Sequence, residues 1–159
     1  MIPWGEFRAQ RPDLAEAGQS LLCQWDVGLG FIASVRPDGG PRLHPICPVV
    51  TDTGLYALLI PSPKLRDLLR DGRYALHSYP CPDNEDAFYV TGAIRLIEAA
   101  GDREAIIAAF LSQPGREGPT PSFEDQTLVE LLIDTCLLTR TIGHGDPHAK
   151  HTIWKAPAT

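Results

Sequence analysis

Hydrophobic and polar residues alternate along several short segments of this chain, as they do in β-strands that bury one face. The longest such segment covers residues 88–96, in which Phe88, Val90 and Ile94 fall on the same face. Gly92 stands at its centre, and a glycine there favours a bulge or a close approach of a neighbouring backbone. The pattern predicts one long strand with an irregularity in its middle.

The clearest hairpin comes earlier in the chain. Residues 31–36 have strand composition, residues 37–40 read Pro-Asp-Gly-Gly and predict a turn, and the chain returns over 42–50. Pro45 and Pro48 cannot donate hydrogen bonds to a neighbouring strand. We therefore expect the return strand to be bulged or to lie partly at a sheet edge.

Three further strands and three helices complete the predicted elements. The strands are expected over residues 55–60, 73–79 and 129–142; the last is assigned because Val, Ile and Thr are frequent in it. Helical spacing of apolar residues predicts helices over 12–24, over 64–69 and from Gly101 onward, with a Pro- and Gly-rich loop over 113–122.

About six strands in mostly antiparallel order, with short helices between them, predict a mainly β fold that closes or nearly closes into a barrel. Closure removes exposed sheet edges. The chain has 159 residues and shows no internal repeat, so we expect residues 1–159 to form a single domain.

The charge of the chain narrows the classes of partner. A net charge of −6 argues against nucleic-acid binding, which needs a basic face. No apolar run reaches the roughly 18 residues that span a bilayer, and the first residues lack the basic and apolar regions of a signal peptide. We expect a cytoplasmic protein with neither nucleic acid nor membrane as a partner.

The four cysteines are Cys23, Cys47, Cys81 and Cys136, and no two of them are close in sequence. Disulfide frameworks belong mostly to short secreted chains, so we expect reduced thiols. Cys47 and Cys136 lie in apolar stretches, which predicts that they are small core residues.

Candidate chemistry gathers at Ser62-Pro63-Lys64, where a strand gives way to a short helix. A helix N-terminus presents unpaired backbone N–H groups, and a lysine beside them adds a positive charge. Arg42, near the start of the return strand, is a second candidate cation. Such a corner suits a phosphate, and in an acidic protein it indicates a phosphorylated small-molecule cofactor. For both cations the alternative is an ordinary solvent-facing residue.

His44 falls on the same strand face as Arg42, because side chains alternate with a period of two. A neutral imidazole there can hydrogen-bond a cofactor ring or donate a proton, which makes His44 the candidate catalytic residue. A partly exposed structural histidine is the alternative.

The spacing of His144, His148 and His151 superficially suggests a metal site. The residues between them are turn-like, and no cysteine or carboxylate pattern completes a ligand set. We expect no metal there, and instead a solvated tail that becomes ordered at a dimer interface.

Four segments together resemble the pyridoxamine 5′-phosphate oxidase-like family, whose members are flavin-binding split β-barrels. They are 32–42 (IASVRPDGGPR), 62–68 (SPKLRDL), 72–77 (GRYALH) and 88–92 (FYVTG). The chain is most similar to the branch that includes binders of FMN and of the deazaflavin F420. The resemblance implies a split β-barrel of about six antiparallel strands and an FMN cofactor, with F420 as the alternative.

The resemblance also implies roles for single residues. Arg42 and Leu43 correspond to the strand that lies along the flavin, and Leu58 to the strand position whose backbone meets the edge of the isoalloxazine ring. Ser62 and Lys64 correspond to the phosphate-binding cluster.

Family members are typically homodimers with two cofactors at the subunit interface, which implies that Trp154 approaches the partner's flavin. The chain departs from the pyridoxamine phosphate oxidases themselves at two places. Pro63 stands where they usually have Arg, and residues 150–155 replace their arginine-rich end. Vitamin B6 oxidation is therefore not expected.

No P-loop, catalytic serine motif or nucleophile–base pair is recognisable, which suits a redox protein whose cofactor carries the chemistry. We expect an oxidoreductase that uses FMN or F420 on an unidentified small organic substrate. Two alternatives stay open. One is a non-catalytic carrier of flavin or F420, and the other is a haem-binding split barrel in which His44, His148 or His151 ligates iron.

Overall fold

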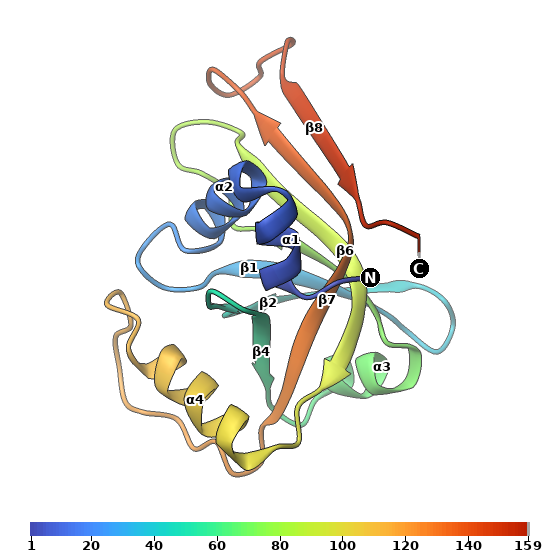
Figure 1. The fold of residues 1–159 in the computed structure, drawn as a ribbon, viewed down its shortest axis with the longest axis vertical. Coiled ribbons are helices and arrows are strands. Elements are labelled where there is room, and N and C mark those ends of the chain that lie inside the picture. Colours follow the sequence, from blue (N-terminus) through green and yellow to red (C-terminus); the bar gives the residue numbers. More distant parts are fainter. Residues whose placement is uncertain (159) are drawn as a thin grey trace.

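Across residues 1–158, which the computed structural model describes, eight strands form one curled antiparallel sheet around an apolar core (Figure 1). The order is β2-β1-β5-β6-β7-β4-β3, and β8 pairs with the far end of β7. The strands are β1 (Gly30–Val35), β2 (Pro41–Ile46), β3 (Val49–Val50), β4 (Leu55–Leu59), β5 (Arg73–Ser78), β6 (Ala87–Leu96), β7 (Thr127–Arg140) and β8 (Lys150–Lys155). The predicted mainly β split barrel is confirmed, with two more strands than the expected six.

The return strand of the first hairpin divides at Cys47 and Pro48. Its first part, β2, pairs with β1, and its second part, β3, pairs with β4. Because β2 and β3 stand at opposite ends of the strand order, this bend brings the two ends of the sheet together. The prolines predicted the irregularity, and the structure shows that the irregularity is a bend that connects the two end strands of the curled sheet.

The longest pairing joins β6 to β7, and its register shifts between Thr91 and Gly92. A Cβ at Gly92 would lie 1.8 Å from the carbonyl oxygen of Leu132. The bulge predicted at this glycine is confirmed, and its cause is the close approach of the neighbouring strand.

The helices are α1 (Trp4–Gln10), α2 (Pro12–Leu22), α3 (Pro63–Asp71) and α4 (Ala100–Leu111). Figure 1 shows α1 and α2 side by side over one part of the sheet, and α4 beside β4 at the other end of the molecule. The last three helices were predicted. The first was not, because a helix of seven residues is shorter than the window in which a helical period is recognised.

The core has two parts. The larger lies between the sheet and the first two helices and includes Trp4, Phe7 and Phe88, all fully buried. The smaller lies under α4 and consists of Val49, Ile106, Phe110 and Leu128.

Cys136 is buried in the larger core, as predicted. The prediction for Cys47 was wrong: it is exposed, because β2 ends at Ile46 and Cys47 lies in the bend. All four cysteines are free.

The C-terminal tail is a strand. β8 pairs with β7 over residues 150–155, and only Trp154 among its residues is partly buried. A strand with one partly buried side chain lacks the alternation from which strands are predicted. Within residues 1–158 no helix is both long enough and apolar enough to cross a membrane.

Candidate functional site

The start of α3 is formed by a capping serine. The backbone N–H of Leu65 donates to Oγ of Ser62 over 3.3 Å, and Pro63 occupies the first helical position. Ser62 thus satisfies one of the helix's free N–H groups and fixes where the helix begins. Since a hydroxyl both accepts and donates, its hydrogen stays available for a ligand oxygen.

Lys64 lies in the first turn of this helix and is half-buried. Burial lowers its pKa below the ordinary value, and the nearby Cys47 acts in the opposite direction. No carboxylate in the described chain lies within 4.0 Å of its ammonium group. A partly desolvated cation without a counter-charge is suited to an external anion.

Arg42, the other predicted phosphate ligand, forms an ion pair. Its Nε donates to Oδ2 of Asp67 over 2.6 Å, and the Oγ of Ser34 donates to the same oxygen over 3.4 Å. Asp67 is only 4% exposed and belongs to α3. Arg42 therefore connects β2 to α3, and its guanidinium is at least partly occupied by this contact.

Side chains along β2 alternate between the two faces of the sheet, so its candidate residues lie on different faces. Arg42 and His44 lie on the inner face, where His44 stands opposite the buried Ile32 of β1. The His44 side chain is half-buried and makes no hydrogen bond to any residue in the range 1–158. Leu43 points to the other face and is 63% exposed.

Leu58 lies on β4 where one edge of that strand is open. β3 pairs only with Leu55 and Tyr56, whereas β7 pairs along β4 as far as Leu59. Within the described residues, no strand covers the β3 side of β4 at Leu58. The side chain of Leu58 packs on the small core beneath α4.

Trp154 lies away from this corner, on β8. Its ring contacts Phe7 of α1 in the same chain, with ring centroids 4.9 Å apart and an edge-to-face geometry. The structure thus gives Trp154 a partner within its own subunit, and its approach to a second subunit's cofactor stays a prediction.

Sequence reasoning did not assign Cys47 and Arg116 to this corner. Arg116, in the loop after α4, holds its guanidinium carbon 4.6 Å from the ring centre of Phe110. Partial desolvation raises the pKa of the Cys47 thiol, while Arg116 and Lys64 both lower it. Two cations thus act on one thiol, and no local sequence pattern connects these three residues.

The C-terminal histidines do not gather. Nδ1 of His151 lies 3.0 Å from Oγ1 of Thr139, and Nε2 of His144 lies 3.2 Å from the carbonyl oxygen of Pro82. In the portion of the chain that the structure describes, no three His, Cys, Asp or Glu side chains are grouped to hold a metal ion.

Several solved structures share this architecture. No family model and no curated protein sequence matches the chain. Among solved structures, a heme binding protein from Mycobacterium smegmatis is similar at a TM-score of 0.66 and 14% identity, over 87% of this chain and 57% of that one. A Clostridium acetobutylicum protein related to general stress protein 26, of the pyridoxinephosphate oxidase family, is similar at 0.60 and 12%, over 95% of both chains.

A third similar structure is an F420 reductase, with a TM-score of 0.55 and 17% identity, over 74% of this chain and 94% of that one. The chain has the split-barrel fold of the pyridoxamine 5′-phosphate oxidase-like proteins. Identities this low show a shared fold. The chain spans 57% of the mycobacterial protein, so the remainder of that protein has no counterpart in the alignment.

Proposed function

We propose that this split barrel binds a phosphorylated flavin-type cofactor, FMN or alternatively F420, and acts as an oxidoreductase on a small organic substrate. The observation that carries the proposal is Lys64: a half-buried cation without a carboxylate partner in the described chain, next to the Ser62 cap at the start of α3. The shared fold with an F420 reductase supports it.

The donors at this corner fit a phosphate. Lys64 offers three ammonium hydrogens and Ser62 offers its hydroxyl hydrogen. The backbone N–H of Lys64 is also free within residues 1–158, because Pro63 has no N–H and the N–H groups of Leu65 and Arg66 both donate to Ser62. The ion pair of Arg42 with Asp67 holds β2 against α3 and so keeps these donors in place. Arg116 adds a second positive charge that acts on Cys47.

The ring of the cofactor would lie along β2 and the open edge of β4. The uncovered backbone at Leu58 can hydrogen-bond a heterocycle, and the unpartnered imidazole of His44 can hold a proton beside it. The cofactor supplies hydride transfer when bound. The chain's own residues bind the phosphate, orient the ring and position a proton.

We also propose a homodimer that uses the outer face of the sheet. Leu43 on β2 and Ile153 on β8 are 63% and 64% exposed on this face. Phe31 of β1 stacks on Tyr79, with ring centroids 5.2 Å apart, and both rings are only partly covered. An apolar strip of this kind is typical of protein–protein interfaces.

Titration of the protein with FMN and with F420, followed by fluorescence, tests the proposal. Lys64→Met should weaken binding of the cofactor by about tenfold to a hundredfold, as expected for loss of one charge-assisted hydrogen bond to phosphate. Arg66→Met is the matched control, since Arg66 is an exposed cation of the same helix with no ion pair in the described chain. Equal affinities for Lys64→Met and the parent protein would overturn the phosphate assignment.

Turnover separates an enzyme from a carrier. A protein that binds FMN or F420 but neither reduces nor reoxidises it with any electron donor or acceptor supplied would be the carrier that the sequence left open. Haem binding is a second candidate, favoured by the similarity to a heme binding protein and by the free imidazole of His44. It predicts a Soret band on haem addition that His44→Ala abolishes and His148→Ala retains.

A further inference from the structure

A cavity lies beside the N-terminal end of α4, away from the Pro- and Gly-rich loop that follows this helix, and none of the residues of the α3 corner lines it. It has a volume of about 390 Å³ and is lined by residues of α4, β4, β6, β7 and the N-terminal segment. This volume is within the roughly 300–1,000 Å³ range of small-molecule sites. The cofactor proposal uses none of these residues, so the two stand independently.

The cavity contains a buried carboxylate. Glu130 of β7 is 3% exposed, and Nε of Arg95 donates to its Oε2 over 2.9 Å. Nη2 of Arg95 donates to the same oxygen. Oε1 of Glu130 accepts no hydrogen bond from residues 1–158. One oxygen of a nearly fully buried carboxylate is therefore available inside a cavity.

Strand register places two more polar groups around this carboxylate. Tyr56 of β4 and Arg95 of β6 both stand directly opposite Glu130, one on each side of β7. Directly opposed residues project to the same face of a sheet. The three side chains thus form a row across three strands, facing α4.

The opposite wall belongs to α4. Asp102 in its first turn adds a second carboxylate, and Ile106 together with Ile97 adds apolar surface. Burial is the main cause that raises the pKa of Tyr56; Glu130 and Asp102 raise it as well, while Thr53 and Arg95 act in the opposite direction. The phenol is therefore neutral at physiological pH, and the cavity holds two carboxylates against one guanidinium.

We propose that this cavity binds a small organic cation, a primary ammonium or an amidinium, between Oε1 of Glu130 and the carboxylate of Asp102. The apolar part of the ligand would pack on Ile97 and Ile106. Arg95 does not favour an anion here, because two of its donors already point at Glu130. The net charge of the lining selects a cation over an anion of the same shape.

The test uses three probes of similar size: n-butylammonium, n-butanol and butyrate. Amide chemical shifts are followed by NMR as each probe is added to the full chain. We expect n-butylammonium to shift the amides of the cavity-lining residues with a roughly millimolar dissociation constant, as suits a ligand of so few atoms. Weaker effects are expected from n-butanol and none from butyrate.

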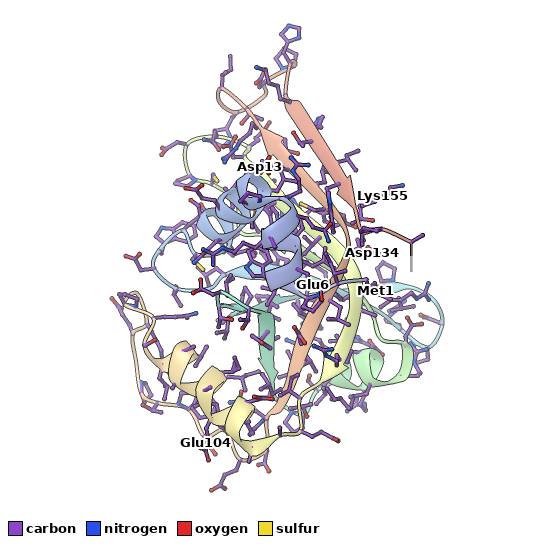
Figure 2. The ribbon with its side chains drawn as sticks, viewed as in Figure 1. Met1, Glu6, Asp13, Glu104, Asp134 and Lys155 are labelled. Atoms are coloured by element: carbon purple, nitrogen blue, oxygen red, sulfur yellow. The ribbon has the colours of Figure 1, made fainter. Side chains whose placement is uncertain are left out.

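Two conservative variants assign the effect to the cavity. Asp102→Asn should weaken n-butylammonium binding at least threefold, and Glu130→Gln should abolish it. Glu130→Gln also disturbs the ion pair with Arg95 and can impair folding. Tyr56→Phe is therefore a second probe of the cavity lining, and it should change the pattern of amide chemical-shift changes that n-butylammonium causes. Glu104→Gln is the control, since Figure 2 shows Glu104 on the outer side of α4, away from the sheet. Tighter binding of butyrate, no cavity shifts with n-butylammonium, or an Asp102→Asn variant that binds like the control would overturn the proposal.

Discussion

The Nε of Arg42 donates a 2.6 Å hydrogen bond to Oδ2 of Asp67, and this ion pair joins the inner face of β2 to the helix that carries Lys64. The Asp67 side chain is 5% exposed, whereas the Arg42 side chain is 29% exposed. The pair is thus buried at one end only. In this arrangement Arg42 acts on the α3 corner by positioning the helix.

Replacing Arg42 should therefore destabilise the fold. Arg42→Met keeps the length of the side chain but leaves Asp67 with only the 3.4 Å contact from Ser34. We expect the free energy of unfolding to fall by about 2–3 kcal/mol, less than the 3–5 kcal/mol typical of a fully buried pair because Arg42 reaches solvent. Urea denaturation measures the loss, with Arg66→Met as control. Equal stability of the two variants would show that the ion pair contributes little.

Periodicity predicted most of the barrel because its strands bury one face. The alternation over 88–96 corresponds to β6, and the proline positions in 42–50 marked the bend that separates β2 from β3. β8 was not predicted, because only Trp154 among its side chains is partly buried. Its sequence therefore shows no alternation of apolar and polar residues. α1 was not predicted because its seven residues make only about two helical turns, fewer than are needed to recognise a helical period.

The residues of the candidate site also fall into those that the sequence predicted and those that it did not. Ser62 and Lys64 were predictable because a helix cap and its first turn are local in sequence. The pair of Arg42 with Asp67 joins residues 25 positions apart, and Arg116, which acts on Cys47, lies in a loop with no pattern of its own. The row of Tyr56, Glu130 and Arg95 depends on the register of three strands, which no single segment specifies.

The bulge in β6 gives a prediction about the backbone. Gly92→Ala would place a methyl group 1.8 Å from the carbonyl oxygen of Leu132, so the paired strands must separate. We expect a loss of about 3 kcal/mol in the free energy of unfolding, at the upper end for overpacking. Gly101→Ala is the matched control, because a Cβ there meets nothing within 4 Å and α4 gains a better helix former. Thermal unfolding of both variants measures the loss of stability. A Gly92→Ala protein as stable as the parent protein would contradict the prediction.

The proposed homodimer makes Leu43 a test position. Leu43→Glu puts a charge into the apolar outer face and should shift the protein from dimer to monomer in sedimentation equilibrium. Its circular dichroism should be unchanged, since the side chain is exposed within one subunit. Ile142→Glu serves as the control, because Ile142 is 96% exposed in the loop between β7 and β8. A parent protein that sediments as a monomer, or a Leu43→Glu protein that stays dimeric, would count against this interface.

The neighbourhood of Lys64 can be tested without any cofactor, through Cys47. Partial desolvation raises the pKa of this thiol, and the positive charges of Arg116 and Lys64 lower it. Lys64→Met removes one of these charges, so the thiol pKa should rise and the thiolate fraction at pH 8 should fall. Because thiolate is the reacting form, alkylation of Cys47 by iodoacetamide should slow by about threefold.

Peptide mass spectrometry follows Cys47 separately from the other thiols, and Lys155→Met is the control for loss of a distant charge. Inorganic phosphate should slow the same reaction in the parent protein, because a bound anion offsets Lys64 and Arg116 and so raises the thiol pKa. It should have a smaller effect in Lys64→Met. If phosphate leaves the alkylation rate of the parent protein unchanged beyond the effect of ionic strength, the corner does not bind this anion, and the proposed cofactor phosphate would need another site.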